Sequence, residues 1–215
     1  MTDGTATSTS LPRQPVNEAM TIIDLKPEQT EEAVRLLARA YATNPLPVAV
    51  FGPGQIDANE AFFRIGLTVM KGQKFVAVDG PRVVGVIHWV DSPNCQFSSA
   101  EKLRLLPTMV KGFGLRSAIR VGGWLSAWSK HDPAEHHVHL GPIGVSPEAQ
   151  GRGIGRQLMQ QFCHQLDERG AVGYLETDRP ENVHFYTRSG FGVTGTASIQ
   201  GVVNYFMRRG ARGAG

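Results

Sequence analysis

Cysteine is scarce in this chain, which has only Cys95 and Cys163 among its 215 residues. Two cysteines cannot build a disulfide framework, and neither has a histidine or a second cysteine at the spacing of a zinc motif. We therefore expect a reducing compartment, structural roles for both cysteines, and no metal site.

Long apolar runs are also missing. The longest, near residues 83–90, is far shorter than the roughly 20 residues that a membrane span requires. The first ten residues, MTDGTATSTS, have no apolar core of the kind found in a signal peptide. The sequence therefore predicts a cytoplasmic protein with no membrane partner.

A large excess of one charge is absent as well, because the formal net charge is only +3. The arginines are scattered and form no basic stripe interleaved with aromatic residues, so we expect no nucleic-acid partner. With 41% apolar residues, the length suits one domain, expected over 19–208, acting as a monomer or homodimer. Residues 1–18 have few large apolar groups and are expected to be a disordered tail, and 209–215 a frayed end.

The most informative stretch is residues 137–169, which has the pattern of a strand, a glycine-rich turn and a helix. Apolar residues typical of a strand occupy 138–145, but Gly141 and Pro142 interrupt them. Since proline inside a strand is tolerated only at an edge or bulge, the strand is expected to lose one pairing partner partway along. Beyond Pro147, an apolar stripe at helical spacing begins at Ile154 and ends before Gly170.

The turn between them carries glycines at 151, 153 and 155. Their missing side chains would let a ligand reach backbone N–H groups that have no partner within the helix. Those groups and the positive end of the helix dipole favour a phosphate or diphosphate, and Arg152 and Arg156 add positive charge. The alternative is a merely flexible turn. The spacing is neither the dinucleotide-binding fingerprint nor a P-loop.

The rest of the chain predicts an ordered series of elements around this unit. Before it we expect a strand at 20–25, a helix at 28–42 that ends at Asn44-Pro45-Leu46-Pro47, a second helix capped by Asp57, and a hairpin of strands 74–78 and 82–90. After it we expect a strand at 171–177, a helix at 181–188, and closing strands at 191–196 and 202–207. Residues 98–130 have the pattern of two helices broken by glycines at 112, 114, 122 and 123. This insertion either shapes a binding pocket or simply covers the sheet.

The glycine turn and its surroundings resemble one family. Gln150-Gly151-Arg152-Gly153-Ile154-Gly155 is similar to the Gln/Arg-x-x-Gly-x-Gly/Ala acetyl-CoA motif of the GNAT N-acetyltransferase superfamily, and residues 140–147 resemble the strand before it. Residues 174–178 and the Asn-x-x-Phe-Tyr segment beginning at Asn182 extend the resemblance over about 137–192. It implies an α/β (α+β) GNAT fold with a mixed sheet of about six or seven strands flanked by helices, and acetyl-CoA as co-substrate.

The resemblance also implies roles for individual residues. Ile143, Gly144 and Val145 would bind the pantetheine arm as an added strand does, with the Val145 amide polarising the thioester carbonyl. The implied cofactor-binding set is Ile143, Gly144, Val145, Gln150, Gly151, Arg152, Gly153, Ile154, Gly155, Arg156, Asn182, Phe185 and Tyr186. Tyr186 is also the candidate general acid, because a phenol is protonated at neutral pH and can donate to a departing thiolate. The alternative for Tyr186 is a core tyrosine beside Phe185.

The general base is less evident from the sequence. His139 shares a strand face with His137 and has a suitable pKa, and Glu176 is the second candidate. His139 aligns with the first histidine of the His-x-His pair in aralkylamine acetyltransferases, but the second falls on Gly141. Glu135 and His88 are rivals, and these histidines could equally be polar surface.

Together these features predict an acetyl-CoA-dependent N-acetyltransferase in which a bound amine attacks the thioester directly. The glycine-rich segments resemble the small-molecule, puromycin-type branch, which favours a small primary amine as acceptor. One alternative is a protein N-terminal or lysine acetyltransferase, which would need an open acidic groove. The others are a non-catalytic acyl-CoA-binding module and a nucleotide-binding protein.

Overall fold

The computed structural model describes residues 20–211. The predicted tail at 1–18 and the last residues of the predicted frayed end, 212–215, lie outside the described residues. Arg209, which the sequence assigned to the frayed end, is instead the last residue of a strand and is buried. Its guanidinium forms an ion pair with Asp167 at 2.8 Å and donates to the Ser189 carbonyl at 3.1 Å, which holds the chain in the sheet one residue beyond the predicted boundary.

The sheet contains seven strands, in agreement with the predicted six or seven. They are β1 (Thr21–Asp24), β2 (Gln73–Asp79), β3 (Arg82–Asp91), β4 (His137–Val145), β5 (Val172–Thr177), β6 (Gly192–Ile199) and β7 (Val202–Arg209). Their order is β1-β2-β3-β4-β5-β7-β6, and only β4 and β5 run parallel. The predicted hairpin is the β2–β3 pair, and the predicted closing strands are β6 and β7.

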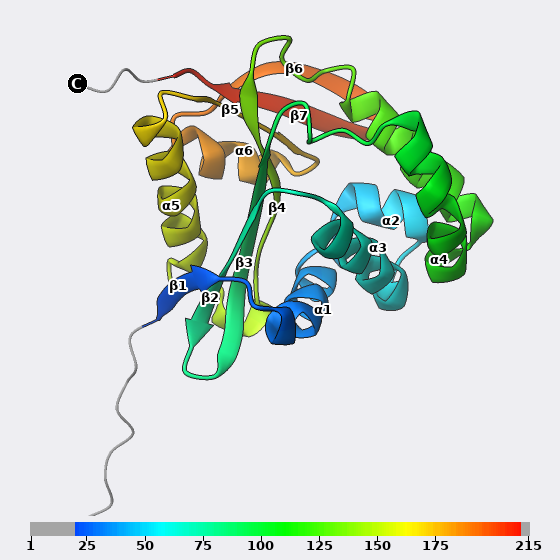
Figure 1. Cartoon of the computed structure of the whole chain (residues 1–215), viewed down its shortest axis with the longest axis horizontal. Helices are drawn as coiled ribbons and strands as arrows, with labels where there is room; N and C mark the ends of the chain where they lie inside the picture. Colours follow the sequence, from blue (N-terminus) through cyan, green and yellow to red (C-terminus); the bar gives the residue numbers. More distant parts are fainter. Residues whose placement is uncertain (1–19, 212–215) are drawn as a thin grey trace, which may run out of the picture.

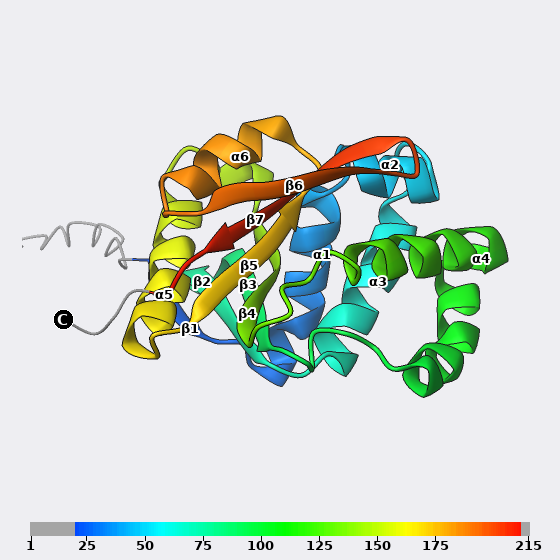
Figure 2. The ribbon, with the colours of Figure 1, turned by 90° about the horizontal axis from the view of Figure 1, so that it is seen from above.

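Helices cover both faces of this sheet (Figure 1). The helices are α1 (Thr30–Ala40), α2 (Pro45–Phe51), α3 (Ile56–Val69), α4 (Ser99–Trp128), α5 (Ile154–Glu168) and α6 (Pro180–Thr187), and short 3-10 turns cover Pro27–Gln29 and Pro147–Ala149. The apolar faces of α5 and α6 pack on one side of the sheet, while α1 and α3 pack on the other side of its N-terminal half. Figure 2 shows α4 on the same side of the molecule as α2 and α3, and α2 and α4 share a third apolar cluster with β5, β6 and β7. No helix within residues 20–211 combines the length and apolarity needed to cross a membrane.

Strand β4 separates from β5 partway along, as the Gly141-Pro142 interruption predicted. Its parallel pairing with β5 covers only residues 137–139, whereas its pairing with β3 continues to Val145. Ser146 donates its N–H to the Val84 carbonyl at 3.0 Å. Because hydrogen-bonded and non-bonded residues alternate along an antiparallel pair, Gly144 also bonds to β3, and Ile143 and Val145 point their backbone groups into the gap that β5 has left.

One helix was missed and one predicted helix cap was wrong. Asn44-Pro45-Leu46-Pro47 does end the first helix, but it also begins α2, which the sequence did not predict. Proline is tolerated in a first helical turn, and the Leu46 N–H there donates to the buried Asp178 carboxylate at 2.7 Å, a partner 132 residues away. Asp57 lies inside the first turn of α3, because that helix begins at Ile56 after Gln55.

The insertion, α4, consists of two helical segments on either side of a kink, as the sequence predicted. The bend is at Phe113 and Gly114, and Gly114 has a φ of 80° that other residues rarely adopt. The prediction that Gly122 and Gly123 also interrupt the helix was wrong. Val121 and Trp124 on either side of them are buried against the sheet, and this packing outweighs the low helix propensity of glycine.

Candidate active site

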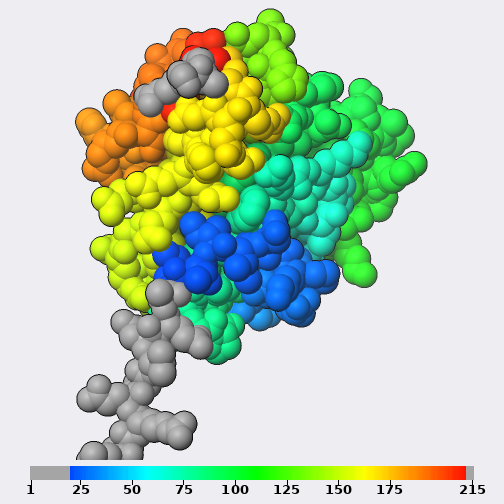
Figure 3. Space-filling model, turned by 60° about the vertical axis from the view of Figure 1, so that its left-hand side comes forward, coloured from blue at the N-terminus to red at the C-terminus, as the bar shows by residue number. Residues whose placement is uncertain are grey.

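Two hollows lie near the gap where β4 and β5 separate. A groove of about 1040 Å³ lies beside α5 and is lined by α5, α6 and the glycine-rich turn. A smaller pocket of about 170 Å³ is lined by Tyr41 at the end of α1 and by residues of α2, α3, α4, α6, β3, β4 and β5. Figure 3 shows the outer face of α5 in yellow with the orange C-terminal segments beside it.

The glycine-rich turn forms the head of the groove. Gly151 and Gly153 both have a φ of 79°, and Gly153 directly precedes the first residue of α5. A Cβ atom placed on either glycine would meet nothing within 4 Å, so both backbones are open to a ligand. The first bond of the helix runs from the Gln157 N–H to the Gly153 carbonyl, which leaves the preceding amides of the turn as donors. This is the geometry of an anion site.

The two arginines of the turn differ in their surroundings. The Arg152 guanidinium forms an ion pair with Asp79 of β2 at 2.9 Å, so part of its charge is already balanced. Arg156 is exposed and lines the groove. Arg156 is therefore the better placed of the two to contact an anionic ligand.

Backbone carbonyls in the gap are already hydrogen-bonded by side chains. The Tyr41 hydroxyl donates to the Ile143 carbonyl at 3.1 Å, and the Gln150 amide donates to the Val145 carbonyl at 3.5 Å. The backbone groups of Gly144 point toward β3 instead of into the gap. A Cβ added at Gly144 would come within 2.8 Å of the Leu37 side chain. Gly144 thus allows α1 to pack closely against β4, while Ile143 and Val145 offer their N–H groups to a ligand.

The residues predicted to bind the cofactor separate into three groups. Those that line the groove are Val145, Gln150, Gly151, Gly153, Ile154, Gly155, Arg156 and Phe185. Asn182 and Tyr186 line the pocket instead, and Ile143, Gly144 and Arg152 line neither hollow. The sequence did not single out the groove residues from the far end of α6, among them Arg188 and Ser189.

Tyr186 lies between the two hollows at the end of α6. Its side chain is 5% exposed, and its ring packs edge-on against Phe185 at a centroid distance of 5.2 Å. Burial raises the pKa of the Tyr186 phenol well above its usual value, with further contributions from Tyr41 and Asp178. The hydroxyl is therefore a proton donor throughout the physiological range.

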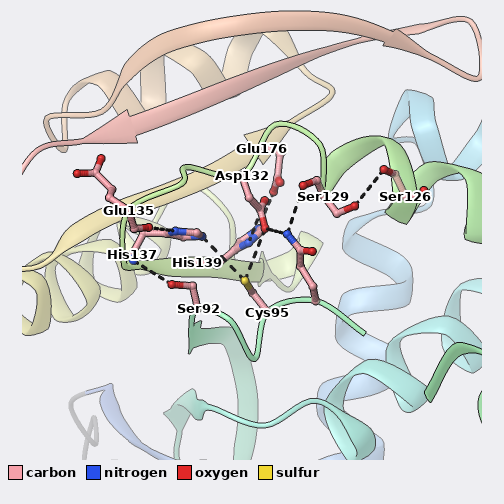
Figure 4. Close-up of polar contacts among 10 residues, drawn as sticks. Ser92, Cys95, Ser126, Ser129, Asp132, Glu135, His137, His139 and Glu176 are labelled. Carbon is pink, nitrogen blue, oxygen red and sulfur yellow. Dashed lines mark hydrogen bonds and ion pairs between the residues drawn. The ribbon is translucent and has the colours of Figure 1, made fainter. Parts of the chain in front are cut away.

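His139 and Glu176 meet at the floor of the pocket (Figure 4). His139 Nε2 lies 2.8 Å from Glu176 Oε2, while the other carboxylate oxygen, Oε1, is buried without a hydrogen-bond partner. Burial alone would lower the pKa of His139, but the charge of Glu176, the neighbouring Cys95 thiol and the hydrogen bond to Glu176 raise it well above its usual value. Glu176 thus lines the pocket and has one buried carboxylate oxygen without a hydrogen-bond partner.

The two rival bases are placed differently. His88 also lines the pocket, but burial lowers the pKa of its ring to about 4, and Nε2 is held by the Lys71 carbonyl at 2.8 Å. A Cβ at Gly141 would come within 2.6 Å of the His88 ring, so His88 occupies the space a side chain at 141 would need. The Glu135 carboxylate is partly exposed and binds Arg208 at 2.6 Å, away from the pocket.

The walls of the pocket are aromatic and come largely from the helices. Phe62 of α3 stacks on Trp124 of α4 at 5.2 Å, and Trp128 packs edge-on against Trp124 at 5.1 Å. The insertion at 98–130 therefore both lines the pocket and packs on the sheet. The sequence had offered these two roles as alternatives. Sequence reasoning missed Tyr41, Asn44 and Asp178 as pocket residues, since nothing local distinguishes them from core and loop positions.

Comparison with known proteins links this arrangement to a family. The model of the Acetyltransferase (GNAT) family matches residues 49–191. The mycothiol acetyltransferase of Nocardia farcinica is 38% identical over 71 residues, which are 32% of this chain and 23% of that protein. The N-alpha-acetyltransferase RimI of Mycobacterium tuberculosis is 38% identical over 105 residues, 45% of this chain and 63% of that protein. The matches thus span about a quarter of the first relative and somewhat under two thirds of the second.

Solved structures share the fold over nearly the whole chain. A histone acetyltransferase HPA2-related protein from Corynebacterium glutamicum superposes with a TM-score of 0.69 at 19% identity, covering 91% of this chain and 98% of that one. Arylalkylamine N-acetyltransferase 2 from Aedes aegypti gives a TM-score of 0.63 at 12% identity, covering 91% and 100%. At such low identities these likenesses establish the fold, which agrees with the mixed seven-stranded sheet.

Proposed function

This chain belongs to the GNAT acetyltransferase family, and from that premise we propose that it transfers an acetyl group from acetyl-CoA to the primary amine of a small molecule. The observation that carries the proposal is the gap between β4 and β5, which has near it both a groove headed by open backbone amides and a small pocket lined by the Glu176 carboxylate. One hollow suits the co-substrate and the other suits a cationic acceptor.

The residues of the groove fit acetyl-CoA. The open amides of the glycine-rich turn and the side chain of Arg156 would hold its diphosphate, and the Ile143 and Val145 amides would bind its pantetheine arm. Bound acetyl-CoA would supply the thioester carbonyl that is attacked. The Val145 amide, which points into the gap, is the donor that would polarise this carbonyl.

The pocket supports a small amine as acceptor. Its volume of about 170 Å³ and its aromatic walls leave room for a compact apolar group, whereas a protein substrate needs an open groove. An acceptor ammonium would pair with the unsatisfied Oε1 of Glu176, and this pairing would remove the cost of a buried, unpaired carboxylate oxygen. The mycothiol acetyltransferases among the relatives, whose name indicates a small-molecule acceptor, are consistent with this choice.

The proton transfers follow from the same residues. Glu176 takes the proton of the ammonium, and His139 keeps Glu176 in place through the 2.8 Å hydrogen bond. The amine nitrogen then bonds to the acetyl carbon as the carbon–sulfur bond breaks, and Tyr186 donates its proton to the departing sulfur. The acylated nitrogen releases its remaining excess proton, which restores the Tyr186 hydroxyl. Of the two base candidates, we assign proton acceptance to Glu176, because its Oε1 atom has no hydrogen-bond partner whereas His139 Nε2 is already bonded to Glu176.

Coenzyme A release with a panel of amines tests this function. We expect release with small primary amines that carry an apolar or aromatic group, and a fall in kcat/KM of about 100-fold on Glu176→Gln, as for the loss of a general base. Glu135→Gln is the matched control, because this carboxylate binds Arg208 outside the pocket.

Three outcomes would contradict the proposal. Release of coenzyme A only with peptide N-termini would favour a protein N-terminal acetyltransferase, the activity named for the RimI relative. Acetyl-CoA binding without release for any acceptor would indicate a binding module. Loss of activity in Glu135→Gln but not in Glu176→Gln would overturn the assignment of the base.

A further inference from the structure

Four side chains that the proposed reaction does not use as a group converge beside the pocket. Cys95 lies in the segment between β3 and α4, Asp132 in the segment between α4 and β4, and His137 and His139 on one face of β4. One potential ligand atom from each of these residues lies within 4.8 Å of those from the other three. In Figure 4 these side chains point toward a common centre.

Two atoms of this cluster lack partners. Asp132 Oδ1 and His139 Nδ1 are buried, make no hydrogen bond within the described residues, and lie 3.9 Å apart. The Asp132 side chain is only 7% exposed. Leaving a buried polar atom unsatisfied is costly, so a group that satisfies both atoms is expected between them.

The other polar atoms of His137, His139 and Asp132 already have hydrogen-bond partners. His139 Nε2 contacts Glu176 Oε2 at 2.8 Å, and His137 Nδ1 contacts the Glu135 carbonyl at 2.9 Å. The Asp132 Oδ2 atom accepts from the Gln96 amide. Histidines that bind a metal usually donate their other ring N–H to a carboxylate or a backbone carbonyl, which is the arrangement both rings have here.

The spacing within the cluster is close to that of a metal site. Cys95 Sγ lies 3.9 Å from His137 Nε2, and Asp132 Oδ1 lies 3.9 Å from His139 Nδ1. Ligand atoms around a tetrahedral zinc ion with one sulfur ligand are separated by about 3.3 to 3.6 Å, so the side chains would move inward by a few tenths of an ångström when zinc binds. Thiolate and imidazole ligands favour zinc over magnesium or calcium, which prefer oxygen alone.

We propose that Cys95, Asp132, His137 and His139 bind a zinc ion in a closed, four-ligand structural site. Cys95 precedes α4 and Asp132 follows it, so the ion ties both ends of the insertion to β4. Cys95 and His139 also line the pocket, and the ion thereby fixes the position of its α4 wall. His139 keeps its hydrogen bond to Glu176, which leaves the role proposed for that carboxylate unchanged.

A zinc ion at this position contradicts the expectation of no metal site. No zinc motif is evident in the sequence because the ligands come from three segments, and only the pair His137 and His139 is close in the chain. It also gives Cys95 a specific structural role.

Metal content and unfolding of the full chain test the site, independently of activity. After any histidine tag is removed, protein freed of metal by a chelator is titrated with zinc. We expect one tightly bound zinc per chain, an upward shift in Tm, and at least about 100-fold weaker zinc binding in Cys95→Ser, since a ligand is lost. Cys163→Ser, which changes the other cysteine, should bind zinc as the unchanged protein does.

Cobalt gives a second readout that does not depend on the stability of a variant. Co²⁺ in the unchanged protein should show a thiolate-to-cobalt absorption band and the spectrum of a tetrahedral site. No zinc at one equivalent, equal zinc affinity in Cys95→Ser, or a cobalt spectrum without the thiolate band would each overturn the proposal.

Discussion

Replacing Tyr186 with phenylalanine should lower kcat about 100-fold while leaving the Kd for acetyl-CoA nearly unchanged. The substitution removes one hydroxyl, and a positioned general acid contributes on the order of 100-fold or more to a rate. The Tyr186 ring packs against Phe185, and phenylalanine preserves that contact. Steady-state kinetics together with calorimetric titration of acetyl-CoA would measure both quantities.

Tyr205→Phe is the control for this experiment. Tyr205 lies on β7, outside both hollows, and its loss should not change kcat. An unchanged kcat in Tyr186→Phe would remove the general-acid role. A fall in Tm with unchanged kcat would identify Tyr186 as a core residue, the alternative that the sequence left open.

Replacing Gly153 with alanine should weaken acetyl-CoA binding about 10-fold or more. The residue has a φ of 79°, where an added Cβ costs about 1 to 2 kcal/mol. The methyl group would also project into open space at the head of the groove, where the amides of the turn must be approached closely. Calorimetric titration gives the Kd, and denaturant unfolding gives the loss of stability.

Gly201 offers a matched control because its backbone has a similar positive φ but the residue does not line the groove. Its φ is 80°, a Cβ there would also meet nothing within 4 Å, and it lies in the turn between β6 and β7. Gly201→Ala should lose similar stability and keep its affinity for acetyl-CoA. Equal affinities in the two variants would contradict the proposed contact between the turn and the co-substrate.

The strand, glycine-rich turn and helix beside the groove could be predicted from sequence, because the residue patterns that indicate them are local. Glycines at 151, 153 and 155 directly precede an amphipathic helix, and Gly141-Pro142 marks where β4 loses its partner. Each feature depends on backbone rules that act over a few residues. The strand, turn and helix accordingly form where they were expected.

The acceptor side was much harder to predict, because it is assembled from distant segments. Helix α2 begins at prolines that had indicated only a helix end, and it is held by Asp178 far along the chain. The pocket brings Tyr41, Phe62 and Trp124 together from three helices, none of which carries a local sign of binding. The contacts of Cys95 with Asp132 and His137 arise in the same way, from packing rather than from spacing.

The central claim is that acetyl-CoA binds along the free edge of β4 and on the glycine-rich turn. Residue-resolved amide hydrogen exchange with and without acetyl-CoA tests it most directly. The account predicts new protection at Ile143, Val145 and the amides of residues 151–156, with little change at Gly144 and Ser146, which already bond to β3. Binding of acetyl-CoA without added protection at Val145 and the turn would contradict it.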